Sequence, residues 1–590
     1  MADIHSFVTE QEAGFKRSIL LEEGYDWNFA DHVRRSFLYK NSQFTKDNSK
    51  RSRRPFKNII RPILNIHYRT EGFDVKDIEI YVDNPETYYK SFLVKKYHDK
   101  WALKHAMDTF IDELVESYVD YGGVLVKNVK GVRPEVVDLR TLAFCDQTDI
   151  LSGPFAIKHY FSPSQLRDME KYGWGKTENG ATISIESLVL LSEAHKRQDV
   201  MQESTTPGRY VEIYEVHNVS EMDIDLTAQD SDPMLYVVAK YTNSEGKEQG
   251  SILFKNKEPK LPFKFLARDT VQGRALGFGA IEELFEAQTW TNFGEIHSMG
   301  MLEQASKIFY KTNDPKFKNQ NLTNSENGKV FDLQPNTDFN QIDNFPRNLV
   351  AFTNACEKWY EHARIMGAAS EISLGQQPSA GTPFASLQEQ IKQGNDLHLW
   401  RQGRIAVFVD EIYRDWVIPQ LGKEIVKGTK FLSTLTSEEM RTIADTIMTN
   451  AANSMIKETI LAGQIPDAGQ MEGMKQMFTA TFFKSNKKFI EILKDEMSDE
   501  KLDVSTNIAG KQKNLALITD KVVNIIRQFI ATPEIRQDPE MIKLLNVILE
   551  SSGLSPMIFS PQLSPLQPQG RGGSEPLEKF GQTTKEAVTV

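Results

Sequence analysis

The strongest candidate for a nucleotide site is Gly175-Lys176-Thr177, which has the form of the end of a phosphate-binding loop. Such a loop needs a glycine five residues before Gly175, where this chain has Glu170, and it follows an apolar strand that is missing here. The backbone amides that would cradle a phosphate are therefore not arranged by this sequence. We interpret the segment as a polar turn.

A second glycine cluster, Gly273, Gly277 and Gly279, precedes a long apolar segment. Its spacing is not G-x-G-x-x-G, and no acidic residue follows at the distance that a dinucleotide ribose requires. Glycine also permits tight turns and close backbone contacts. We predict that this cluster turns the chain sharply into a helix.

Metal ligands are sparse. Four aspartates lie close together and could bind a divalent cation, but they lack the glycine and terminal glutamate of a calcium loop, so we favour a solvated loop. The histidines are scattered, and the two cysteines are too few for a disulfide framework and lack zinc-ligand spacing. We therefore expect no catalytic residues, no metal and no cofactor. The residues considered are Asp223, Asp225, Asp230, Asp232, Cys145 and Cys356.

The elements that would position these residues follow from periodicity. Apolar residues recur at helical spacing from His105 to Tyr121, and Gly122-Gly123 ends that helix. Short β-branched or aromatic runs bounded by glycine, proline and asparagine then predict strands. They are GVLVKNV, PEVVDL, FAIKHYF, RYVEIYEVHNV, MLYVVAKYTN and QGSILFK. A mixed α+β region over 55–270 follows.

Three long helices are predicted after this region. The first follows the glycine cluster, the second covers 347–372, and the third ends near Trp416. A polar, strand-forming insert separates the first two, and the loop SLGQQPSAGTPFAS separates the last two. The pattern is helical again after Pro419, to about residue 550. The Pro, Gly, Gln and Ser composition of the remainder predicts disorder.

Composition excludes several classes of protein. The 590 residues are 40% apolar, as in folded soluble proteins, and no run approaches the ~20 uninterrupted apolar residues of a membrane helix. The start lacks a signal-peptide core, so synthesis in a reducing cytosol is expected. A net charge of −11 argues against a protein that coats nucleic acid by bulk attraction, although it fits a conduit that must not adhere to DNA.

The order of these elements resembles the tailed-bacteriophage portal protein, the head-to-tail connector. The segment GFGAIEELFEAQTWTNFGEIHSMGMLEQASK resembles that family's first stem helix and carries its Gln288 and Asn292. The resemblance implies an α+β fold with a mixed wing, a helical-hairpin stem, a small α/β clip and a helical crown, assembled as a ring. The implied parts are an N-terminal arm 1–54, wing 55–276, stem helix 277–307, clip 308–345, second stem helix 346–372, tunnel loop 373–386, long wing helix 387–420, crown 421–552 and tail 553–590.

The resemblance also implies where DNA and partners would make contact. The tunnel loop would touch the DNA backbone transiently, because its polar side chains are neutral. Glu357 and Glu361 form a like-charge i, i+4 pair that must face solvent; the channel and a solvated outer face are both open readings. The loop residues are Gln376, Gln377, Ser379 and Thr382, and the clip residues for partner docking are Lys316, Lys318, Asn327 and Lys329.

A portal would be a non-enzymatic dodecameric ring at one capsid vertex of the virion, made in the host cytoplasm. Double-stranded DNA would pass through it during packaging and ejection. Its partners would be terminase, the major capsid protein, scaffold and head-completion or tail adaptor proteins, with no membrane. Two alternatives stay open: a phage nucleic-acid enzyme with an acidic metal site, and another tail or internal virion protein. Large aromatic residues of the stem, such as Trp290, Phe293, Trp359 and Tyr360, are expected in the core or at subunit interfaces.

Overall fold

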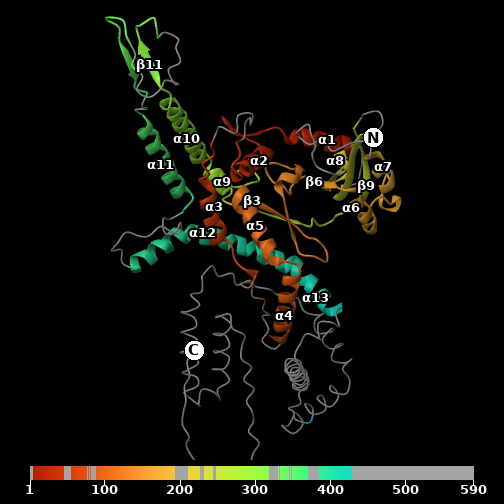
Figure 1. The fold of residues 1–590 in the computed structure, drawn as a ribbon. Coiled ribbons are helices and arrows are strands. Elements are labelled where there is room, and N and C mark those ends of the chain that lie inside the picture. The colour runs from red at the N-terminus through yellow and green to blue at the C-terminus, as the bar shows by residue number, and fades with distance from the viewer. Residues whose placement is uncertain are drawn as a thin grey trace, which may run out of the picture. The chain divides into compact units, whose positions relative to one another are not determined.

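The structure is a computed structural model. It describes residues 4–44, 55–75, 78, 80, 88–192, 210–225, 231–242, 248–317, 330, 332–344, 346, 348–369, 384–427 and 473. The chain divides into two units, Met1–Gly510 and Lys511–Val590, and the described residues all belong to the first. They form a mixed arrangement of helices and sheets (Figure 1), as the predicted α+β class requires. No described helix has the length and apolarity that crossing a bilayer would demand.

The largest sheet has five antiparallel strands in the order β5-β6-β7-β8-β9. Apolar side chains on one face pack against α1, and those on the other face pack against α6 and α7. Because both faces are covered, buried residues occur at most positions of the central strand β7. The strands are β5 Leu142–Phe144, β6 Phe155–Phe161, β7 Val211–Val219, β8 Met234–Thr242 and β9 Glu248–Lys257. The helices are α1 Ile4–Phe15, α6 Pro163–Met169, α7 Ile185–Ser192 and α8 Glu221–Ile224.

A second core surrounds helix α5, Met107–Tyr121. The six apolar residues that defined its predicted face are all buried, and Gly122 ends it with a φ of +81°. A small antiparallel sheet, ordered β10-β3-β4, lies beside it. The elements of this region are β1 Ile19–Glu22, β2 Tyr25–Trp27, α2 Phe29–Lys40, α3 Ile60–Glu71, α4 Tyr88–Lys104, β3 Gly123–Lys127, β4 Glu135–Val137 and β10 Phe263–Ala267. All six predicted strands are confirmed; β1, β2, β5 and β10 were not among them.

The predicted helical hairpin is present, with shorter helices than expected. Its first helix starts at residue 280 instead of 277 and is interrupted at Leu284, which separates α9, Ala280–Glu283, from α10, Phe285–Ala305. The second helix, α11, covers Leu349–Met366 and ends at Gly367. Between them, β11 Phe309–Thr312 pairs with β12 Phe339–Ile342. The described part of the insert is therefore a β-ribbon, while 318–329 lies outside the described residues.

The third long helix continues further than predicted. Helix α12 covers Phe384–Ile412, a π-helical turn follows at Tyr413–Val417, and α13 runs on to Lys427. The prediction that the third helix ends near Trp416 was therefore wrong, because the helical run continues through Pro419. A proline lacks the N–H of the regular bond and crowds the carbonyl four residues earlier. In the π turn, the N–H of Ile418 bonds to the carbonyl of Tyr413, which loosens the helix where the proline ring must fit. The crown and the tail lie outside the described residues.

Three glycines allow three backbone segments to cross in contact, and we call this feature the glycine crossing. The carbonyl of Gly122 accepts hydrogen bonds from the N–H of Arg268 (2.9 Å) and of Gly277 (3.0 Å). A Cβ on Gly277 would overlap the carbonyl of Arg268, and one on Gly279 would lie 2.6 Å from the carbonyl of Asp120. The predicted tight turn is thus confirmed. It joins the end of α5, the end of β10 and the start of α9.

The other glycine motif is also a turn. Gly175 has a φ of +72°, and its N–H donates to the carbonyl of Leu253 (2.8 Å). A 3-10 turn at Thr177–Asn179 follows, and no strand leads into it. An amide that bonds to the edge strand β9 is not available for a phosphate, so the polar turn is confirmed.

We predict that Gly277→Ala lowers the free energy of unfolding by about 3 kcal/mol, because the added Cβ cannot fit without moving a buried backbone. Gly14→Ala is the matched control. Its Cβ would meet nothing, and alanine favours the α1 helix by up to ~1 kcal/mol. Urea unfolding monitored by circular dichroism measures both. Equal stability of the two variants would show that the crossing is not tightly packed.

Candidate functional site

The helical hairpin is held together by a close contact between α10 and α11. A Cβ on Gly294 would overlap the Sγ of Cys356, so the two helices approach each other where this side chain is missing. Figure 1 shows the two helices side by side with β11 at their far end. At 1.5 Å per residue, the 21 residues of α10 extend about 32 Å and the 18 of α11 about 27 Å.

The base of the hairpin is anchored by Gln288 and Asn292, which are both buried. The side chain of Gln288 accepts from the N–H of Ile59 (2.9 Å) and donates to the carbonyl of Lys57 (2.6 Å). Asn292 accepts from the N–H of Lys57 (3.0 Å). These two stem residues therefore hold the extended segment before α3, because they supply partners for backbone groups that no sheet satisfies.

One face of the hairpin carries a row of aromatic rings, which we call the aromatic face. It consists of Trp290, Phe293 and His297 on α10, with Phe352 and Trp359 on α11. Trp290 stacks on Trp359, with ring centroids 6.1 Å apart, and His297 stacks on Phe352 at 6.2 Å. Trp290 and Phe293 nevertheless remain 49% and 47% exposed. Tyr360 packs against the core around α5.

The opposite side of α10 is also apolar. Met299 is nine residues after Trp290, and Leu302 is nine residues after Phe293, which places each half a turn away from its counterpart. Met299 and Leu302 are 54% and 46% exposed. The hairpin therefore presents apolar groups on two different sides of α10, and those two sides are chemically unlike.

The predicted site residues are only partly within the described part of the chain. Glu357 and Glu361 are both exposed on the outer side of α11, which confirms that this pair faces solvent. Lys316 is exposed in the turn after β11, where its N–H donates to the Asp314 carboxylate (2.9 Å). The other seven lie outside the described residues: Lys318, Asn327, Lys329, Gln376, Gln377, Ser379 and Thr382.

The acidic segment has a structural use. Asp223 accepts from the N–H and hydroxyl of Ser220 (both 2.7 Å) and so caps α8, and Asp232 pairs with Lys257 (2.7 Å). Asp230 lies outside the described residues. These contacts fit the predicted solvated loop, since both carboxylates already have partners on the surface.

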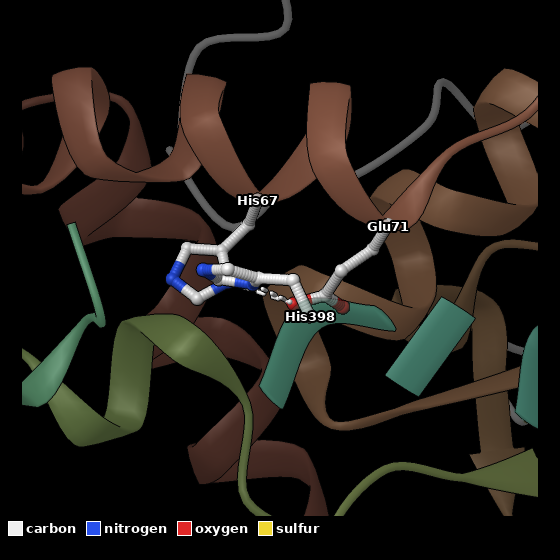
Figure 2. A group of neighbouring side chains, drawn as sticks. All are labelled: His67, Glu71 and His398. Atoms are coloured by element: carbon white, nitrogen blue, oxygen red, sulfur yellow. Dashed lines mark hydrogen bonds and ion pairs between the residues drawn. The ribbon is translucent and has the colours of Figure 1, made fainter. Parts of the chain in front are cut away.

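A buried group of charged residues lies where the hairpin, α3 and α12 meet, and we call it the charge hub. One carboxylate oxygen of Glu71 accepts from Nδ1 of His67 (2.8 Å), from Nδ1 of His398 (3.1 Å) and from Nη2 of Arg268 (3.1 Å). Figure 2 shows His67 and Glu71 on one helix, with His398 reaching them from another. Glu71, His67, His398 and Arg268 are fully buried.

Arg401 extends the hub toward the start of α9. It contacts Asp269 and Glu283, the latter at 3.2 Å, and its Nη1 lies 3.7 Å from Glu71. Arg268 also approaches Glu283 (3.8 Å). The two guanidinium groups therefore alternate with three carboxylates contributed by different elements. Such pairing is needed because a buried charge without a partner destabilises the folded state by several kcal/mol.

Burial and pairing shift the pKa values of the hub. Burial lowers the pKa of His67 to about 4, so its imidazole is neutral near pH 7. Burial alone would raise the pKa of Glu71, but hydrogen bonds from His398 and His67 and the charge of Arg268 lower it well below its usual range. Burial raises the pKa of Glu283. Glu71 is therefore the permanent anion that organises the hub.

A metal centre is the other reading of this group. Single ligand atoms of His67, Glu71 and His398 lie within 4.8 Å of one another, a spacing that a divalent cation could bridge. However, Nη2 of Arg268 lies 3.2 Å from Nδ1 of His67 and equally close to Glu71. A cation would have to displace this guanidinium and then stand beside Arg401. We therefore interpret the hub as an ion-paired junction.

We did not predict the charge hub from the sequence, although the spacing of two of its residues was a signal for it. His67 and Glu71 are at i, i+4, the spacing that places two residues on one face of a helix, here α3. Their partners Arg268 and His398 lie 197 and 327 residues away from Glu71. Periodicity carries no information on contacts at such separations.

We predict that Glu71→Gln lowers the free energy of unfolding by about 3–5 kcal/mol, because it removes the charge that neutralises Arg268 in a buried place. Glu357→Gln is the control, since the same substitution on the exposed side of α11 should change stability by less than about 0.5 kcal/mol. Denaturant titration of both variants tests this. A mild effect of Glu71→Gln would mean that water or a counterion replaces the carboxylate.

Stability should fall as pH drops from about 6.5 toward about 4, with a limiting slope of about 1.4 kcal/mol per pH unit from His67. The sign follows because the unfolded imidazole binds a proton in this window and the folded one does not. The free energy of unfolding should differ less between pH 6.5 and pH 4.5 in His67→Gln than in the unmodified protein. The matching NMR titration should leave the His67 ring unchanged above pH 5. A titration midpoint near pH 6.5 would show that the His67 imidazole is not desolvated.

Comparison with known proteins gives only distant structural likeness. No family model matches the chain, and no curated protein matches it. Among solved structures, it is similar to a chain of the neck of an empty GTA particle computed with C6 symmetry, with 9% identity and a TM-score of 0.30 over 79% of this chain and 100% of that one. A chain of the virion of a native gene transfer agent particle gives 9% and 0.29 over 78% and 99%. A chain of the native GTA neck computed with C12 symmetry gives 10% and 0.27 over 72% and 95%. TM-scores this low carry no argument about function.

Proposed function

We propose that this protein is a portal-type subunit, a non-enzymatic component of a phage-like virion that assembles into a ring around a DNA channel. The α10–α11 hairpin would be the stem of each subunit, the β11–β12 ribbon its clip, and the sheet region with α5 its wing. The ring would sit at one capsid vertex after synthesis in the host cytoplasm. Double-stranded DNA would cross it during packaging and ejection.

The observation that carries this proposal is the pair of unlike apolar sides on α10. A closed ring built from one kind of chain needs head-to-tail contacts, in which each copy offers two different complementary surfaces. The aromatic face and the Met299–Leu302 side lie half a turn of helix apart and both remain about half exposed, so α10 can contact a different neighbouring copy on each side. Exposed apolar surface on several helices also favours association over a monomer.

The charges on the outer side of α11 suit a channel wall. Glu357 and Glu361 are exposed, and no described residue forms an ion pair with either. Copies arranged in a ring would repeat these carboxylates around the bore. Like charge would keep the DNA phosphates from adhering, whereas lysine or arginine would bind them. The segment with Gln376, Gln377, Ser379 and Thr382, which lies outside the described residues, would make the transient contact with DNA.

Partners are proposed from the same arrangement. Terminase would dock on the clip during packaging, near Lys316, and head-completion or tail adaptor proteins would replace it. Wing surfaces would meet the major capsid protein and scaffold. The β-ribbon suits a docking element, since a two-stranded ribbon with exposed apolar groups is marginally stable until it packs against something.

The enzyme alternative gains no support from the described residues. Its strongest candidate would be the charge hub, where a carboxylate and two imidazoles converge. Those groups are fully buried, Glu71 already accepts from Arg268, and His398 is already bonded to Glu71, so a substrate has no access to them. A catalytic group must come within hydrogen-bond reach of its substrate.

We expect a large oligomer at micromolar concentration, well above the 67.3 kDa of one chain, with a central hole in negative-stain images. Trp290→Ala with Phe293→Ala should weaken assembly by ten- to a hundredfold, because both rings are about half buried in the monomer and docking adds only about half of the ~1.5–3 kcal/mol that full burial of each would give. Leu103→Ala, at an exposed position on α4, is the control. Light scattering across a concentration series that finds only monomers would end the portal proposal.

Reversing the charge of the channel wall should make the ring bind DNA. Glu357→Lys with Glu361→Lys should retain linear double-stranded DNA at low salt and release it as salt rises, by counterion release. Glu357→Gln with Glu361→Gln keeps the shape without the positive charge and should pass DNA as the unmodified ring does. Packaging assays with proheads and terminase complete the test. If rings of the variant with Glu357→Lys and Glu361→Lys package DNA normally, positions 357 and 361 lie on the outer surface of the ring and not in the channel.

A further inference from the structure

The long helix α12 leaves a row of apolar residues exposed on the side opposite the charge hub. Trp400 and Val407 are 54% and 62% exposed, and Gly403 lies between them at the spacing of one helix face. We call these three residues the α12 stripe. His398, Arg401 and Ile405 occupy the other side of the helix and are buried. The hub thus fixes the rotation of α12, and the stripe must face outward.

Gly403 leaves a gap in this stripe. It lies in the interior of a 29-residue helix, where glycine is less stable than alanine. A Cβ at this position would meet no atom within 4 Å, so nothing in the described chain requires a glycine here. The missing side chain leaves a gap between Trp400 and Val407. A gap of this kind lets a ridge of another helix approach closely.

We infer that the aromatic face of a second copy of this chain docks on the α12 stripe, with Phe293 entering the gap at Gly403. This inference rests on the proposed ring and names one of its contacts. Within one chain the two surfaces do not meet, because Trp290, Phe293, Trp400 and Val407 all remain exposed. Two copies related head to tail can bring them together.

Charges beside the two surfaces are complementary. The Arg404 guanidinium lies 5.4 Å above the Trp400 ring, and Glu286 is exposed one helical turn before Trp290. Among the described residues, neither Arg404 nor Glu286 has an ion-pair partner. Opposite charges beside facing apolar surfaces set the register of an interface and suppress wrong pairings. Docking would give each of these two residues its partner.

The test uses engineered cysteines, because Cys145 and Cys356 are both buried. The double variant Phe293→Cys with Gly403→Cys should form a ladder of linked chains on mild oxidation. Each single variant alone should not, and a mixture of the two single variants should give linked dimers only. Phe293→Cys with Leu103→Cys is the control, since Leu103 is exposed on α4 and belongs to neither surface.

The outcomes separate this inference from the proposed ring. An oligomer in light scattering without the ladder would overturn the inference and leave the ring standing. A link within one chain, or Phe293→Cys linking to itself, would overturn it as well. A chain that is monomeric at all concentrations would overturn both.

A charge exchange tests the same contact without cysteines. Arg404→Glu and Glu286→Arg should each raise the concentration needed for assembly at least tenfold, and the double variant should restore it. Lys100→Glu, at an exposed position on α4, should have no effect. If the loss of assembly free energy in the double variant equals the sum of the losses in the two single variants, these residues do not face each other.

Discussion

The arrangement of this molecule depends on the burial of one carboxylate. Glu71 lies at the end of α3 without contact to solvent, and removing a charge from water costs several kcal/mol. His67 on the same helix offsets part of that cost, and the other donors come from the end of β10 through Arg268 and from α12 through His398 and Arg401. These elements are therefore constrained to meet at one point, where Glu283 adds the end of α9.

The glycine crossing lies next to this point, and the two features depend on each other. Arg268 donates its backbone N–H to Gly122 in the crossing and its side chain to Glu71 in the hub. A shift of either contact would move the other. Because α9 leads directly into α10, the direction in which the hairpin leaves the core around α5 is set by this junction. A rigid junction is what a subunit needs if many copies must present their surfaces at one repeated angle.

The apolar surfaces show how such a subunit can be stable yet incomplete. The described chain buries two large clusters around α5 and the five-stranded sheet, and it still exposes rings and methyl groups on α10, α11 and α12. Exposed apolar residues that occur singly need no explanation, but rows of them on several helices mark surfaces of association. Glu357 and Glu361, which are exposed on α11, differ in chemistry from these apolar rows.

Local patterns in the sequence determined much of the fold. Helical spacing from Met107 to Tyr118 identified α5 and its buried face, and alternating β-branched runs identified six strands, because these signals lie within a few residues of each other. The end of the third helix near Trp416 was predicted wrongly, since a π turn makes room for Pro419 and the helical run continues past it. The portal-type interpretation likewise came from the order of the elements.

Only the tertiary structure decided that Glu71, Arg268 and His398 share one buried site, because they are separated by up to 327 residues and none of them alone differs from an ordinary polar residue. It also decided which rings of the stem remain exposed, since burial depends on what packs on a helix and not on its own periodicity.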